Sequence, residues 1–164
     1  MFLGSNIGNY EKKEAEEMVA LFANYMHPKD KLLIGFDLQK NPELIAQAYN
    51  DPSGITRRFN LNLLERINRE LGGNFDLERF DFYAYYNAET GENRSFLVSL
   101  REQTVHIDAL NKDFNFSRNE LIYTELSKKY TIDEIETLGN INQLSTIRHF
   151  LDSKGYFSDS LFEK

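Results

Sequence analysis

Apolar residues recur every three or four positions between Glu11 and Met26, with lysine and glutamate residues between them. This spacing places the apolar residues on one face and predicts an amphipathic helix. Asn9 stands at the position expected for the N-cap of this helix. The apolar stripe consists of Ala15, Met18, Val19, Phe22, Ala23 and Met26.

A nearly continuous apolar run, KLLIGFDL at Lys31–Leu38, follows the polar HPKD segment and predicts a strand buried on both faces. Met1–Gly4 predicts a shorter strand before the helix. Strand, helix and strand make a βαβ unit, whose right-handed crossover would place both strands in one parallel sheet. The loops Gly4–Asn9 and Asp37–Asn41 would then lie at the carboxyl edge of that sheet, where such folds bind ligands.

Two more helices are predicted after Leu38. Asn41 is placed to cap the first of them, and Pro42 occupies its first position. The second helix continues through SGITRRFNLNLLERINRELGG and ends at Gly72. Its apolar residues recur every four positions, and we expect this stripe to face the core: Ile55, Phe59, Leu63, Ile67 and Leu71.

The second half of the chain consists of predicted strands around one helix. RFDFYAYYN and RSFLVSLREQTVHID, joined by the polar AETGE turn, predict a β-hairpin, so that an α+β module follows the helices. Thr131 and Glu134 form a capping box for a helix that runs through Leu138 and ends at Gly139. STIRHFLD and YFSDSLFE flank the SKG turn and predict a closing hairpin.

Composition narrows the class of protein. A chain of 164 residues with 41% hydrophobic content has the size of one ordinary globular domain. Its net charge of -7 disfavours nucleic acid and anionic membrane surfaces as partners. The absence of cysteine excludes disulfides and thiolate metal sites, and the three histidines lack the spacing of metal ligands. With no apolar run of about 20 residues and no secretory signal, we expect a cytoplasmic protein.

Several segments carry a resemblance that covers essentially the whole chain. FLGSNIGN, LLIGFDL, GITRRFNLNLLERINRELGGNFDLERF, LVSLREQTV and YTELSKKYT together resemble the histidine-specific, S-adenosylmethionine-dependent N-methyltransferase family. The resemblance implies an α/β fold, in which a partial Rossmann-like class I methyltransferase sheet is interrupted by an α+β substrate-binding module. Residues 1–39 and 130–164 would be the remnant of the methyltransferase core, and residues 40–129 the module. The implied cofactor is S-adenosylmethionine, and the implied acceptor is histidine or a similar amino acid.

Members of this family carry a further stretch of similar length before the FLGS-like strand, and that stretch holds the glycine-rich cofactor loop. No GxGxG loop with an acidic residue about 20 positions later occurs in this sequence. The resemblance therefore implies a C-terminal half that is weakly active or inactive alone, with cofactor contacts at Gly4, Ser5 and Gly8. We also expect self-association, most simply as a homodimer, through the exposed edge of the first strand.

Methyl transfer from a sulfonium needs an aligned neutral amine and a shaped pocket, so positioning residues are expected in place of a metal or a catalytic acid and base. The resemblance implies that Asn9 and Tyr49 hold the head group of the amino acid. It also implies that Glu125 and Ser127, two residues apart on an extended segment, hold the imidazole ring. Phe59 matches an aromatic residue of the family motif. Ser95 aligns where family members carry a larger apolar side chain beside the ring.

Each of these residues also has a structural interpretation. Asn9 is a natural helix cap, Tyr49 could cover the core from a helix end, and Phe59 lies in the apolar stripe of its helix. YTELSKK could be a solvated, charged strand. Two other functions also stay open: a non-catalytic binding module on a truncated methyltransferase scaffold, and one half of a split enzyme.

Overall fold

The computed structural model describes all 164 residues and divides into two compact units. Unit 1 comprises residues 1–42, 86–93 and 126–164, and unit 2 comprises residues 43–85 and 94–125. Both units combine helices with mostly antiparallel strands, so the chain is of the α/β class. No helix combines the length and the apolarity that crossing a membrane requires.

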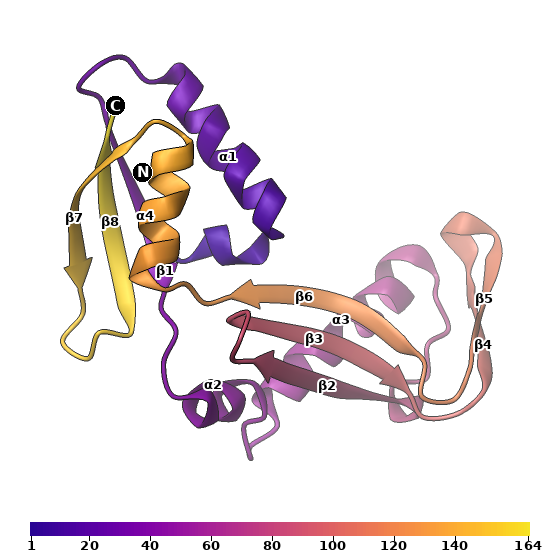
Figure 1. Ribbon diagram of the computed structural model, residues 1–164. Coiled ribbons are helices and arrows are strands. Elements are labelled where there is room, and N and C mark those ends of the chain that lie inside the picture. The colour runs from indigo at the N-terminus through magenta and orange to yellow at the C-terminus, as the bar shows by residue number, and fades with distance from the viewer. The chain divides into compact units, whose positions relative to one another are not determined.

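Unit 1 is built on a three-stranded sheet in the order β1–β8–β7. Both strand pairs are antiparallel, and two helices lie side by side against one face of the sheet (Figure 1). Fully buried Ile34, Phe36 and Phe162 form the centre of its core. The elements are η1 (Asn6–Asn9), α1 (Lys12–Tyr25), β1 (Lys31–Asp37), α4 (Ile132–Ile141), β7 (Ser145–Leu151) and β8 (Phe157–Glu163).

The strand predicted at Met1–Gly4 is reduced to one residue. Phe2 forms a parallel bridge with Ile34, and its N–H donates to the Leu33 carbonyl at 2.8 Å. The parallel direction agrees with the predicted βαβ unit. The expectation of a parallel sheet around β1 is nevertheless wrong, because β8 returns from a hairpin and pairs with β1 antiparallel along its whole length.

The N-cap predicted at Asn9 is also wrong. Asn9 is the last residue of the 3-10 turn η1, and α1 begins after Glu11. The Glu11 N–H donates to the Glu14 carboxylate at 2.9 Å, which is half of a capping box. Asn9 is separated from the first N–H groups of α1 by the end of the turn η1, so Asn9 does not cap this helix.

Unit 2 packs a long helix against strands. The sheet order is β2–β3–β6, and β4 pairs with β5 in a separate antiparallel hairpin. The predicted run RSFLVSLREQTVHID therefore divides into two strands, and its second part belongs to another hairpin. The elements are α2 (Pro42–Tyr49), α3 (Ile55–Leu71), η2 (Leu77–Arg79), β2 (Phe80–Asn87), β3 (Glu92–Ser99), β4 (Gln103–Ile107), η3 (Asp108–Leu110), β5 (Lys112–Phe116) and β6 (Leu121–Lys128).

Helix α3 has the predicted length but buries a different face. Its buried residues are Asn60, Leu61 and Leu64, whereas Phe59 is 72% exposed. A spacing of four residues drifts by about 40° per step around a helix with 3.6 residues per turn, so the predicted stripe does not stay on one side. The core role that we expected for Phe59 is therefore wrong.

Helix α4 begins at the predicted capping box and continues past the predicted end. The Thr131 hydroxyl accepts from the Glu134 N–H at 3.1 Å, and the Glu134 carboxylate accepts from the Thr131 N–H at 2.8 Å. Gly139 lies inside the helix, which ends at Ile141. A Cβ at Gly139 would lie 2.8 Å from the Phe162 ring, so this glycine allows close packing and does not stop the helix.

We expect Gly139→Ala to destabilise unit 1 by about 1–3 kcal/mol, because the added methyl group overpacks a fully buried ring. Urea unfolding followed by circular dichroism measures this change. Asn140→Ala, at an exposed position of the same helix, is the matched control and should be neutral or slightly stabilising. Equal stability of Gly139→Ala and the wild type would contradict this packing.

Asp51 holds the start of α3. Its carboxylate accepts hydrogen bonds from the Ser53 hydroxyl at 2.5 Å and from the N–H groups of Ile55 at 2.8 Å and Thr56 at 2.9 Å. These bonds, the one from Ser53 most of all, hold the pKa of Asp51 well below its ordinary value of 3.8. The stabilisation by these hydrogen bonds is therefore fully present above pH 3.8, the pKa of this carboxyl in the unfolded chain. It is lost progressively as the pH falls below that value.

Asp51→Ala should lower the urea midpoint of unit 2 at about pH 6. The difference from the wild type should shrink at about pH 3, because the Asp51 carboxylate is then largely protonated in the unfolded chain but not in the folded one. Tyrosine fluorescence follows the transition at both pH values. Glu65→Ala, at an exposed position within α3, controls for the loss of one acidic charge. A difference that grows on acidification would contradict the capping role.

Candidate functional site

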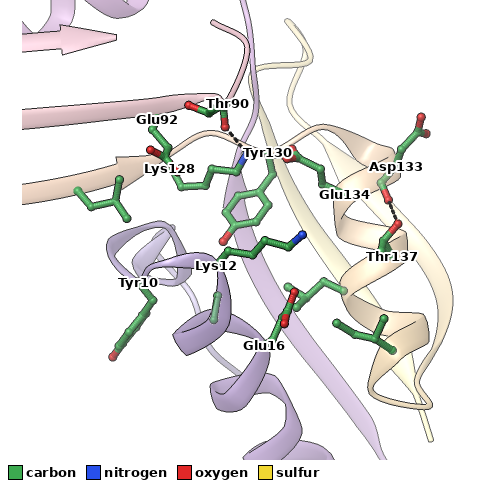
Figure 2. A pocket seen from close by; sticks show the side chains of 14 residues that line it. Tyr10, Lys12, Glu16, Thr90, Glu92, Lys128, Tyr130, Asp133, Glu134 and Thr137 are labelled. Carbon is green, nitrogen blue, oxygen red and sulfur yellow. Dashed lines mark hydrogen bonds and ion pairs between the residues drawn. The ribbon is translucent and has the colours of Figure 1, made fainter. Parts of the chain in front are cut away.

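Unit 1 contains a cavity of about 400 Å³ between α1, α4 and the ends of β3 and β6 (Figure 2). This volume lies within the range of small-molecule sites. Its lining residues come from segments that are distant in the sequence: Tyr10, Lys12, Ala15, Glu16, Thr90, Glu92, Leu126, Lys128, Tyr130, Asp133, Glu134, Thr137, Leu138 and Ile141.

The cavity combines an apolar floor with a charged wall. The buried Tyr130 hydroxyl lies 3.4 Å from the Ile7 carbonyl, and burial raises the pKa of this phenol well above its ordinary value, so it stays neutral. Lys128 Nζ donates to the Thr90 carbonyl at 2.5 Å and to the Glu134 carboxylate at 2.6 Å. Lys128 therefore ties the β2–β3 turn to α4 along one side of the cavity, as Figure 2 shows for Thr90.

None of the residues predicted from the sequence lines this cavity. Leu126 and Lys128 face it, whereas Ser127 lies between them in β6, where alternation directs its side chain to the other face of the strand. Asn9 is exposed at the end of η1, next to the lining residue Tyr10. The sequence offered no motif for the cavity, because its lining residues are contributed singly by several elements.

The opposite face of β6 carries a compact group of charged and polar side chains, here called the Asp37 cluster: Asp37, Lys40, Ser127 and Lys129. Asp37 accepts from Lys40 at 2.6 Å and from Lys129 at 2.8 Å, one ammonium at each carboxylate oxygen. Lys129 also donates to the Ser127 hydroxyl at 2.8 Å and is only 5% exposed. The interpretation of YTELSKK as a solvated strand is therefore wrong at Lys129.

Tyr86 is electrostatically linked to this cluster. Burial is the main cause that raises the pKa of its phenol. The charges of Asp37 and Glu134 raise it further, and the Lys129 ammonium opposes them. The phenol is thus held in its neutral, hydrogen-bonding form.

The predicted cofactor loop forms a tight turn. Gly4 and Ser5 have positive φ values of 78° and 54°. A Cβ at Gly4 would meet no atom closer than 3.5 Å, so a ligand can approach this backbone closely. Gly8 is different, because a Cβ there would lie 2.6 Å from the Lys128 carbonyl oxygen, and packing against β6 is sufficient to require glycine. The chain has no cluster of acidic and histidine side chains arranged to hold a metal ion.

The other predicted residues belong to unit 2. Tyr49 ends α2 and is half-buried, Glu125 is half-buried in β6, and Phe59 is exposed on α3. Ser95 is buried in β3, and its hydroxyl has no hydrogen-bond partner within the chain. Glu125 and Ser127 are confirmed to lie in one strand, two residues apart.

A family model described as "Histidine-specific methyltransferase, SAM-dependent" matches residues 1–164. The chain belongs to this family. The "Histidine N-alpha-methyltransferase" of Mycobacterium tuberculosis (strain CDC 1551 / Oshkosh) is 35% identical over 164 residues, which are 100% of this chain and 51% of that protein. The resemblance inferred from the sequence motifs is confirmed.

Two further matches extend the comparison. "Ergothioneine biosynthesis protein 1" of Schizosaccharomyces pombe (strain 972 / ATCC 24843) is 34% identical over 135 residues, which cover 82% of this chain and 17% of that protein. The structure of the CcbJ methyltransferase from Streptomyces caelestis matches with a TM-score of 0.49 and 6% identity, over 98% of this chain and 54% of that chain. The chain spans about half the length of the bacterial relatives that it matches.

Lys128→Met should lower the stability of unit 1 by about 1–3 kcal/mol, because Glu134 and the Thr90 carbonyl lose a charged donor. Chemical unfolding measures the change. Lys12→Met, at an exposed position on the wall of the same cavity, is the control and should have little effect. If the two variants were equally stable, the connection between the β2–β3 turn and α4 would not contribute to folding.

Proposed function

We propose that this chain is the C-terminal part of an S-adenosylmethionine-dependent amino-acid N-methyltransferase, with L-histidine as the acceptor. The observation that carries the proposal is the family match over residues 1–164, together with coverage of about half of the related enzymes. The proposal assigns residues 1–39 and 130–164 to the methyltransferase core and residues 40–129 to the acceptor-binding module. By itself the chain would bind the acceptor but would be inactive.

The proposed reaction is an in-line displacement at carbon. The lone pair of the neutral α-amino nitrogen forms a bond to the methyl carbon as the bond between carbon and sulfur breaks, and the nitrogen then loses a proton to solvent. S-adenosylmethionine supplies the activated methyl group and leaves as S-adenosylhomocysteine. The protein contributes alignment and the exclusion of water.

Four residues are proposed to hold the acceptor. Asn9 and Tyr49 offer an amide and a phenol for its carboxylate and amino groups, and Glu125 and Ser127 offer a carboxylate and a hydroxyl for the two ring nitrogens. Phe59, an exposed aromatic side chain, is proposed to contact the acceptor as well. Gly4, Ser5 and Gly8 are proposed to approach the cofactor, and the open backbone at Gly4 supports this for the first of them.

Titration of the isolated chain with L-histidine, followed by NMR, tests the proposal. We expect weak binding, with a dissociation constant of about 1 mM, that is lost in Glu125→Ala and kept in Glu17→Ala, whose exposed side chain pairs only with Lys13. S-adenosylhomocysteine should not bind.

Two results would contradict the proposal. Micromolar binding of S-adenosylhomocysteine would mean that this chain completes a cofactor site alone. A lack of histidine binding would instead favour a module that recognises another ligand.

A further inference from the structure

The Lys129 ammonium is buried at the junction of two segments. It lies 2.8 Å from a carboxylate oxygen of Asp37 and 2.8 Å from the Ser127 hydroxyl oxygen. The backbone on both sides is fixed, because the Lys129 N–H donates to the Gly91 carbonyl at 2.6 Å and the Tyr130 N–H donates to the Asp37 carbonyl at 2.9 Å. A buried ammonium is tolerated only with such partners, so its position is tightly determined.

This contact fixes the direction of the hydrogen bond at Ser127. An ammonium group has three donors and no acceptor, so the Ser127 oxygen must accept from Lys129. The hydroxyl has only one proton, and that proton must point away from Lys129. Ser127 therefore offers a donor to any ligand, and the neighbouring positive charge strengthens this donor.

We propose that Lys129, held by Asp37, is a positioning residue that makes Ser127 a hydrogen-bond donor to the acceptor. This rests on the proposed function, in which Ser127 meets a ring nitrogen of histidine. A donor at this place requires an unprotonated nitrogen, and the Glu125 carboxylate, which can only accept, requires a protonated one. The site would then select one neutral tautomer of an imidazole, or another ring with one donor and one acceptor nitrogen.

Rings without an acceptor nitrogen are disfavoured by the same geometry. A phenyl side chain would leave the Ser127 proton and the Glu125 carboxylate without partners, and sites that contain unpaired polar groups reject such analogues strongly. The ratio of histidine affinity to phenylalanine affinity therefore reports the direction of the Ser127 hydrogen bond. A purely structural role of Lys129 would change both affinities together.

The cluster supplies a matched control for charge. Lys40 pairs with the other oxygen of Asp37 at 2.6 Å and makes no contact with Ser127. Lys40→Met and Lys129→Met each remove one ammonium from the same carboxylate. Only the second removes the donor that fixes Ser127.

The test compares the binding of L-histidine and L-phenylalanine to the chain by NMR titration. In Lys129→Met and in Ser127→Ala we expect the affinity for histidine to fall about tenfold, with the affinity for phenylalanine unchanged. Lys40→Met should keep the wild-type ratio. An unchanged ratio in Lys129→Met, or an equal loss of both ligands, would overturn the inference while leaving histidine binding by the wild type, and so the proposed function, intact.

A second measurement does not depend on ligand binding or on how well Lys129→Met folds. The Lys129 ammonium should give a resolved, slowly exchanging nitrogen resonance in the free chain, and Ser127→Ala should shift it. A missing or unshifted resonance would overturn the contact. Failure of the wild type to bind histidine, with this resonance present, would instead reject the proposed function and with it the acceptor role of Ser127.

Discussion

One junction in unit 1 fixes where the chain leaves β1 and where it returns. Leu38 and Tyr130 form a parallel bridge, in which the Gln39 N–H donates to the Tyr130 carbonyl and the Tyr130 N–H donates to the Asp37 carbonyl, each at 2.9 Å. The Tyr130 ring packs against Phe36 with a centroid distance of 5.1 Å. The long segment between Leu38 and Tyr130 therefore begins and ends at one place in the core of unit 1.

The same junction brings the buried Lys129 ammonium next to the carboxylate that compensates its charge. Asp37 and Lys129 are brought together by the backbone bonds that close the junction, so their pairing requires little further ordering of the chain. Removal of Asp37 would leave the buried Lys129 ammonium uncompensated, and such losses exceed the net contribution of the intact pair. Fold stability and the polarity of the Ser127 hydroxyl thus depend on the same contacts.

Local signals in the sequence were sufficient for most elements. Pro42 at the first position of α2, the Thr131 capping box and the Gly72 helix end each act within a few residues, and each is confirmed. The turn residues of the two predicted hairpins act at the same short range. These features depend on backbone conformation and on hydrogen bonds between near neighbours, which the sequence specifies directly.

The features that the sequence did not predict correctly all depend on tertiary structure. Gly139 resembles a helix stop until Phe162, from a different strand, is known to pack against it. Lys129 resembles a surface residue until Asp37 is placed beside it. The cavity has no sequence signal for the same reason, since its lining is assembled from separate elements. Contacts between distant segments decide these features, and one sequence does not reveal them.

The end of β6 is held from both faces. On one face the Lys128 ammonium is fixed by Thr90 and Glu134, and on the other the Lys129 ammonium is fixed by Asp37. Ser127 directly precedes these two lysines, so its backbone has little freedom to turn and its hydroxyl has one orientation left. The hydroxyl is therefore already ordered before a ligand binds. Less conformational entropy is lost when a hydrogen bond forms to a donor that is ordered in advance.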